Sequence, residues 1–154
     1  MSTLIIVTIL IYVIFFAFSF LSYAFNSYGL YEIAKRENEN NQFLAWIPYL
    51  NKFALGRLAF KSNIHGILLV TFNIIGLICL LALLFISTNE KAIIAFSLIS
   101  IIMFVITTIY LYFARYKLYK KYGKSTILLT ILDVISCGIL GPFFVFAIRN
   151  NDEN

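Results

Sequence analysis

Charged residues are scarce in this chain. Asp, Glu, Lys and Arg make up 12% of its 154 residues, whereas hydrophobic residues make up 62%. Residues 1–31, 62–89, 92–114 and 125–148 contain only one charged residue between them, Asp133. Soluble domains average about 45–50% apolar and about 25% charged residues. The composition, with a mean hydropathy of +0.92, therefore excludes an ordinary soluble domain.

Residue types that carry catalysis and metal binding are also scarce. The chain has one histidine, His65, and two cysteines, Cys79 and Cys137, which lie in different apolar segments. This set supplies no Ser-His-Asp triad, no His-Glu-x-x-His zinc motif and no cysteine framework. A glycine-rich phosphate loop is missing as well. We therefore expect no enzyme activity, no metal and no cofactor.

The apolar segments are long enough to cross a bilayer. A helix needs about 20 predominantly apolar residues to span a hydrocarbon core of about 30 Å. Strands of a membrane barrel would alternate in polarity over about 10 residues, whereas these segments are continuous. The sequence predicts an all-α integral membrane protein with one domain over residues 1–154. Four transmembrane helices are expected at about residues 4–25, 64–86, 92–114 and 126–148.

A further apolar segment, residues 43–61, differs from the others because it contains Lys52 and Arg57. A span here would place Lys52 near the bilayer centre, at a cost of about 2.5–3.5 kcal/mol. We therefore expect an interfacial or re-entrant segment. Its helix is predicted to run from Pro48, which suits a first turn, to about Phe60.

The positive charges are unevenly distributed between the loops. Five Lys or Arg residues lie between the first two predicted spans and five between the last two. The loop between the second and third spans has only Lys91, and the C-terminal tail has only Arg149. Since cytoplasmic loops carry the Lys and Arg excess, we expect an external N-terminus and cytoplasmic loops at residues 26–63 and 115–125.

The side of the C-terminus stays open. Gly138, Gly141 and Pro142 lie near the outer end of the fourth predicted span, where they predict a kink or a helix end. A complete span would place the C-terminus outside. A sharp kink would turn the last segment back and place it inside.

Residues 47–51 read Ile-Pro-Tyr-Leu-Asn, and residues 55–57 read Leu-Gly-Arg. This pair of motifs resembles small uncharacterised multi-span membrane proteins of Gram-positive bacteria that carry an Ile-Pro-x-x-Asn segment. A second Ile-Pro-x-x-Asn copy, often present in such proteins, is absent here. The resemblance implies a bacterial plasma membrane and no particular activity.

Asp133 is the one charged residue inside a predicted span, and such residues are candidates for a functional site. At 1.5 Å per residue, Asp133 lies about 12 Å from the cytoplasmic end of its predicted helix. Asn73, Thr107 and Thr108 reach a similar depth in other spans. We predict an intramembrane polar site from these four residues. It serves either as a proton or cation site, or as a hydrogen-bonded cluster around a neutral Asp133 that holds the helices together.

Residues 115–124 interleave basic and aromatic side chains. Beside a span, this pattern favours contact with anionic lipid headgroups over contact with nucleic acid. The tyrosines at spacing three are expected on one helix face at headgroup depth. The predicted lipid contacts are Arg115, Lys117, Lys120, Lys121 and Lys124.

These features favour a non-enzymatic protein that acts through contacts. It would be an accessory subunit of a membrane complex, or a self-protection protein of the immunity type. Its partner would be another membrane protein or a second copy of the chain. The alternative is a small proton- or cation-coupled transporter with Asp133 at its site.

Overall fold

The computed structural model describes residues 2–83 and 90–152. Every element in this part of the chain is a helix, which confirms the predicted all-α class. In chain order the elements are α1 (Ser2–Arg36), the 3-10 helix η1 (Gln42–Trp46), α2 (Leu50–Phe60), α3 (Asn63–Ala82), α4 (Glu90–Tyr122), α5 (Thr126–Ile135), α6 (Gly141–Ala147) and the 3-10 helix η2 (Ile148–Asn150).

Three of these helices, α1, α3 and α4, are long and apolar enough to cross a membrane. They correspond to the first three predicted spans, except that residues 84–86 of the second lie outside the described residues. At 1.5 Å per residue, the 35 residues of α1 measure about 52 Å and the 33 residues of α4 about 50 Å. Both helices are therefore longer than a hydrocarbon core is thick.

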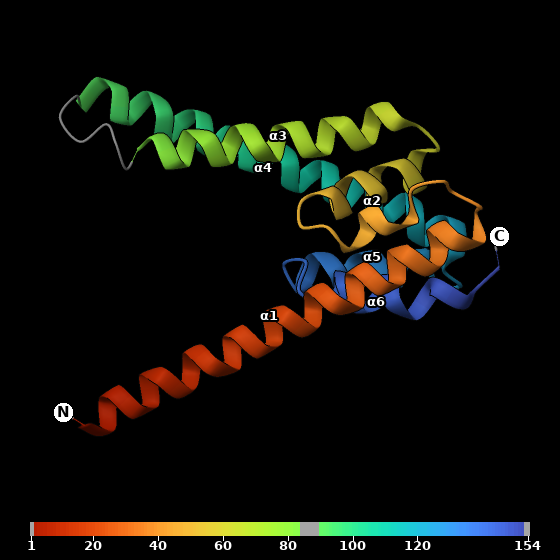
Figure 1. The fold of residues 1–154 in the computed structure, drawn as a ribbon, viewed down its shortest axis with the longest axis horizontal. Helices are drawn as coiled ribbons and strands as arrows, with labels where there is room; N and C mark the ends of the chain where they lie inside the picture. Colours follow the sequence, from red (N-terminus) through yellow and green to blue (C-terminus); the bar gives the residue numbers. More distant parts are fainter. Residues whose placement is uncertain (1, 84–89, 153–154) are drawn as a thin grey trace.

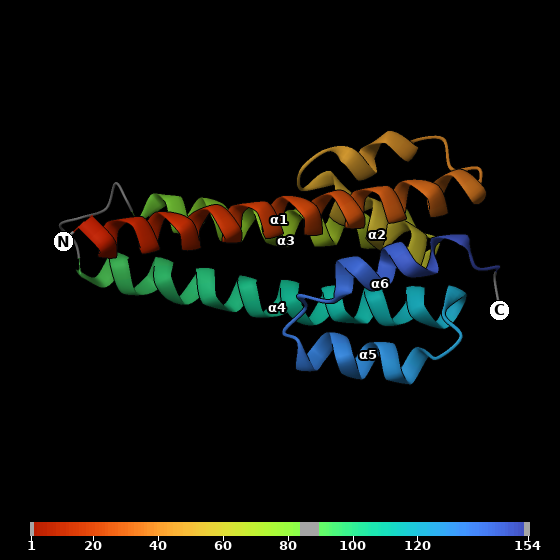
Figure 2. The same cartoon turned by 90° about the horizontal axis from the view of Figure 1, so that it is seen from below.

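The predicted fourth span, residues 126–148, is not a continuous helix. The 10 residues of α5 measure about 15 Å, which is half of a hydrocarbon core. The chain then turns, and α6 runs back toward the end at which α5 began (Figure 2). The count of four spans is therefore not confirmed. The C-terminus lies at the same end of the molecule as the C-terminal ends of α1 and α4 (Figures 1 and 2).

The break after α5 is a Schellman motif. The N–H of Gly138 donates to the carbonyl of Asp133 at 2.8 Å, and the N–H of Cys137 donates to the carbonyl of Val134 at 3.0 Å. These bonds satisfy carbonyls that the helix end leaves free. Cys137 and Gly138 have φ values of 53° and 82°. Because two successive left-handed residues cannot continue an α-helix, the chain reverses here.

The hydrophobic core lies at one end of the molecule. It is formed by the last turns of α1 and α4 together with α2, α6 and single residues of the remaining elements, and includes Leu30, Leu58, Leu118 and Val145. In contrast, none of the most apolar 18-residue window of α1 is buried. Figure 1 shows this part of α1 diverging from the α3–α4 hairpin. The first part of α1 and the α3–α4 hairpin thus form two arms that expose apolar surface, and the core end joins them.

The segment expected to be interfacial or re-entrant forms η1 and α2. The helix α2 ends at Phe60, as predicted, but it begins at Leu50 and not at Pro48. It packs closely on α3, because a Cβ on Gly56 would lie only 2.8 Å from the Cα of Gly66. In Figure 1, α2 lies between α1 and the α3–α4 hairpin at the closed end of the molecule. It therefore separates α1 from the α3–α4 hairpin at that end.

The C-terminal segment is fixed to the core end by polar contacts. Arg36, the last residue of α1, forms an ion pair with Asp152 at 2.9 Å and donates to the carbonyl of Arg149 at 2.9 Å. The Asn151 side chain donates to the carbonyl of Tyr122, the last residue of α4, at 2.8 Å. These bonds hold the C-terminus beside the ends of α1 and α4.

Candidate functional site: a buried ion pair beside a cationic cavity

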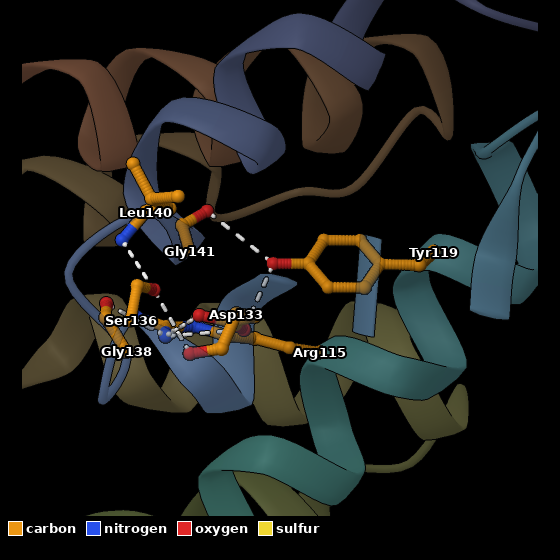
Figure 3. A network of polar contacts seen from close by, with 7 residues as sticks. All are labelled: Arg115, Tyr119, Asp133, Ser136, Gly138, Leu140 and Gly141. Carbon is orange, nitrogen blue, oxygen red and sulfur yellow. Dashed lines mark hydrogen bonds and ion pairs between the residues drawn. The ribbon is translucent and has the colours of Figure 1, made fainter. Parts of the chain in front are cut away.

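Asp133, on α5, forms a buried ion pair with Arg115, on α4 (Figure 3). Nη1 of Arg115 lies 3.1 Å from Oδ1 and 3.4 Å from Oδ2 of the carboxylate. Asp133 is 1% exposed and Arg115 is 7% exposed. Charges this well buried require a partner, so each group accounts for the presence of the other.

Tyr119 completes the coordination of the carboxylate. Its hydroxyl lies 3.1 Å from Oδ2 of Asp133, and the residue is fully buried. Arg115 and Tyr119 are four residues apart on α4, so both side chains project from the same face of the helix. The helical periodicity of α4 thus places the guanidinium of Arg115 and the hydroxyl of Tyr119 beside the carboxylate of Asp133.

The same side chains also hold the turn between α5 and α6. Arg115 donates to the carbonyl of Gly138 at 3.3 Å, and the Tyr119 hydroxyl lies 3.4 Å from the carbonyl oxygen of Gly141. Ser136 accepts the N–H of Leu140 at 3.2 Å. Backbone groups that leave a helix need such protein partners wherever water does not reach them.

Gly141 lets α6 approach the ion pair. A Cβ at this position would lie 2.1 Å from Nη1 of Arg115 and 2.6 Å from Oδ1 of Asp133. Both distances are far below van der Waals contact, so a Cβ here requires these two side chains to move. Any side chain here would therefore displace the pair.

The faces of α5 are inverted relative to a helix of a soluble protein. Its polar Asp133 points inward, whereas Ile127 and Ile135 are each 73% exposed. Leu128, Ile131 and Val134 are exposed as well. An apolar outer face around a polar inner contact is the pattern of a helix in contact with lipid.

The predicted polar layer around Asp133 is not what the structure brings together. Thr107 and Thr108 donate to carbonyls of their own helix at 2.8 Å each, those of Met103 and Phe104. Asn73 lines a separate cavity, and within the described residues none of the three bonds to Asp133. Residues at a similar depth in different helices need not face one another, because the direction of each side chain around its helix axis also decides which residues meet.

The predicted lipid contacts have different environments. Lys117, Lys120 and Lys124 are exposed. Lys121 forms an ion pair with Glu37, and Arg115 is buried against Asp133. Placing Arg115 at the headgroup surface is therefore wrong, because its guanidinium satisfies a carboxylate inside the protein.

The expected tyrosine face at the headgroups is wrong in part. Tyr119 is fully buried and Tyr122 is 4% exposed. Both belong to the hydrophobic core, so they pack the end of α4 instead of anchoring it in lipid.

A cavity of about 410 Å³ lies beside the ion pair. Residues of α1, α2, α4 and the α5–α6 turn line it, among them Ser22, Asn26, Lys52 and Arg115. Nε of Arg115 and Oδ1 of Asn26 are buried, and neither has a hydrogen-bond partner in the part of the chain that the structure describes. Both residues thus line the cavity, although these two atoms are themselves covered.

Lys52 brings a second cation to the cavity. Burial lowers the pKa of Lys52 below its usual value of 10.5, and the nearby Arg115 guanidinium lowers it further. Its Nζ lies 6.0 Å from the ring centroid of Tyr49. Over residues 2–83 and 90–152, no carboxylate pairs with Lys52. Since Asp133 neutralises Arg115, the charge of Lys52 is the excess positive charge in the cavity.

A second cavity, of about 510 Å³, lies on the α3–α4 side of Lys52. Asn73, Gly76, Ser100 and Phe104 are among its lining residues, and Lys52 lines it too. Lys52 thus borders hollow space on both sides.

A scan against protein-family models and searches of curated proteins and of solved structures found no match for this chain. The resemblance to Gram-positive membrane proteins therefore remains an interpretation of the two short motifs at residues 47–51 and 55–57.

The sequence pointed to Asp133 but not to its partners. Arg115 and Tyr119 lie at the border of a basic segment, where they look like other headgroup residues. Their spacing of four residues was the available signal, because it places a cation and a hydroxyl on one face of a helix that adjoins an apolar segment with a lone carboxylate.

Proposed function

We propose that this chain is a non-enzymatic protein of a bacterial plasma membrane that acts through contacts with another membrane protein, as an accessory subunit or an immunity-type protein. The observation that carries the proposal is the first part of α1. Its side chains are apolar and exposed, including Phe16 at 76% and Tyr12 at 71%. A helix that packs on so little of its own chain has a full face available for a partner helix.

The environment of Asp133 favours this function over transport. A transport carboxylate must exchange its proton or cation with the two sides of the membrane, whereas both oxygens of Asp133 lie within 3.4 Å of Arg115 or Tyr119. The carboxylate also stabilises the α5–α6 turn. These contacts support a structural role for the charge. Proteoliposome flux that depends on Asp133 and is abolished in Asp133→Asn would favour the transporter instead.

We further propose three spans, with an external N-terminus and a cytoplasmic core end that includes the C-terminus. Eleven of the twelve Lys and Arg residues belong to the core end, and only Lys91 belongs to the other. The positive-inside rule then supports a cytoplasmic core end. In this arrangement α5 and α6 form a hairpin that enters the membrane from the cytoplasmic side.

Photo-crosslinking tests the contact function. A photoreactive phenylalanine analogue at Phe16 should give a discrete protein adduct in cells, while the same analogue at the buried Leu30 should give none. Only lipid adducts at Phe16, together with isolation as a lone monomer in gentle detergent, would contradict the proposal.

A further inference from the structure

The cavity between α1, α2, α4 and the α5–α6 turn has a lining of two kinds. Lys52 and Arg115 supply two cations, and Phe15, Phe18 and Leu111 supply apolar surface. Phe15 is 71% exposed and Phe18 is 44% exposed, so the cavity adjoins the apolar outer surface of α1. A ligand that fits both kinds of lining is an amphiphile with an anionic end.

The charge in the cavity is unbalanced without such a ligand. Asp133 neutralises Arg115 through the ion pair. Lys52 carries a positive charge of its own, and Arg115 is near enough to affect it electrostatically. An anion between the two side chains would turn this repulsion into two attractions. Both residues line the cavity, so such an anion could approach each of them.

We propose that this cavity binds the phosphate of an anionic glycerophospholipid between Lys52 and Arg115, with its acyl chains along the exposed surface of α1. The volume of about 410 Å³ suits a lipid headgroup, since small-molecule sites occupy about 300–1,000 Å³. Ser19, Ser22 and Asn26 also line the cavity, and their polar side chains suit the hydroxyls of a glycerol headgroup. The site depends on this fold in a membrane and not on the proposed contact function.

Native mass spectrometry of the full-length protein in mild detergent tests the site. We expect phosphatidylglycerol to bind at least tenfold more tightly than phosphatidylcholine, and inorganic phosphate not to displace it at millimolar concentration. Equal binding of the two lipids would overturn the proposal. Displacement by inorganic phosphate would show that the site takes free phosphate, and would overturn the lipid assignment.

Variants distinguish this cavity from general attraction to basic residues. Lys52→Gln should weaken phosphatidylglycerol binding at least tenfold, whereas Lys52→Arg should retain it. Lys120→Gln removes the same charge from an exposed position at the same end of the molecule, and it should change binding less than twofold. Equal losses in Lys52→Gln and Lys120→Gln would overturn the site.

Two further measurements exclude a folding defect as the cause. Without lipid, Lys52→Gln should unfold at the same or a higher temperature than the parent protein, because it removes an unpaired, partly buried charge. Asn26→Asp should also abolish phosphatidylglycerol binding, because its carboxylate would pair with the cavity cations in place of the phosphate. Unchanged lipid binding in Asn26→Asp would place the phosphate elsewhere.

Discussion

Arg115 of α4 and Asp133 of α5 join the two helices through a buried ion pair. A buried ion pair of this kind adds little stability over an apolar pair of equal volume, but loss of one partner leaves a charge without compensation. The pair therefore specifies where α5 lies against α4 more than it adds to the free energy of unfolding.

A double-mutant cycle tests this view. We expect Asp133→Leu to lower the free energy of unfolding by about 3–5 kcal/mol, because it leaves Arg115 buried and unpaired. Adding Arg115→Met should restore a large part of that loss. Unfolding in SDS, followed by the fluorescence of the single tryptophan Trp46, measures both. A loss below about 1 kcal/mol in the single variant would contradict the prediction.

Gly141 offers a steric test of the same contact. We expect Gly141→Ala to destabilise the protein by more than about 2 kcal/mol, because the new Cβ overlaps Arg115 and strains a packed site. Gly76→Ala is the matched control, since its Cβ would meet Met103 at an ordinary 3.4 Å. This control should be neutral or stabilising by up to about 1 kcal/mol, as alanine favours a helix over glycine. The same unfolding assay compares the two variants, and equal effects would contradict the predicted overlap.

The lowered pKa of Lys52 makes lipid binding sensitive to pH. The groups that face Lys52 are Arg115 from α4, Tyr23 from α1 and Tyr49 of its own segment. Because the phosphate requires a charged Lys52, binding should be strongest at pH values below the lowered pKa. It should weaken as the pH rises through the lowered pKa, before 10.5 is reached. The lipid-free protein should gain stability over the same interval, since its unfolded state still binds that proton.

Titration of phosphatidylglycerol binding between about pH 7 and pH 10 measures this effect. Lys52→Arg is the control, since arginine stays charged throughout this range. An identical pH profile in the parent and in Lys52→Arg would assign the titration to another group.

At the scale of helices, the sequence predicted α1, α3 and α4 because each needs only a continuous apolar segment of sufficient length. Residues 126–148 satisfied the same criterion, yet they form two short helices. Hydropathy averages over a window and is blind to backbone conformation, whereas the break depends on left-handed φ angles at Cys137 and Gly138. The glycines and Pro142 were the only sequence signal of that break, and they left the direction of the chain open.

The candidate site was predictable only in part, for a related reason. A lone carboxylate in an apolar segment stands out from the sequence, so Asp133 was found. Its partner was not, because the third span was predicted to end at residue 114, so Arg115 was assigned to the loop. The helix α4 continues to Tyr122, which places Arg115 inside it and beside Asp133 of the antiparallel α5.

Membrane depth of the α5–α6 hairpin can be measured with spin labels. In a Cys79→Ala background, a label at Cys137 in the turn should contact oxygen more, and a water-soluble nickel complex less, than a label at residue 127 in Ile127→Cys/Cys137→Ser. The reason is that, in the proposed arrangement, α5 leads from the cytoplasmic boundary into the membrane. Equal depth at both positions would mean that α5 lies along the surface.

At the scale of the whole molecule, the two ends differ both in the helix ends that meet there and in their content of basic residues. The core end contains the ends of α1 and α4, all of α2 and the C-terminus (Figures 1 and 2), together with nearly all of the positive charge. The opposite end has the N-terminus and the start of α4. The molecule therefore has a closed, basic end and an open, apolar end.

Reporter fusions test this orientation. A reporter fused after Asn154 should be active only if it functions in the cytoplasm, because the C-terminal segment is bonded to Arg36 and Tyr122 at the basic end. Fusion after Lys91 is the control and should favour a reporter that functions outside. An Asn154 fusion that is active only outside would instead support a complete fourth span.

The position of Asp133 also limits which truncated chains can fold. A chain that ends between Tyr122 and Asp133 keeps the guanidinium of Arg115 but lacks the carboxylate that neutralises it. A buried charge without a partner is costly, so such a chain cannot pack the end of α4 as the full chain does. A premature stop at this point would therefore leave a misfolded fragment and not a shorter working protein.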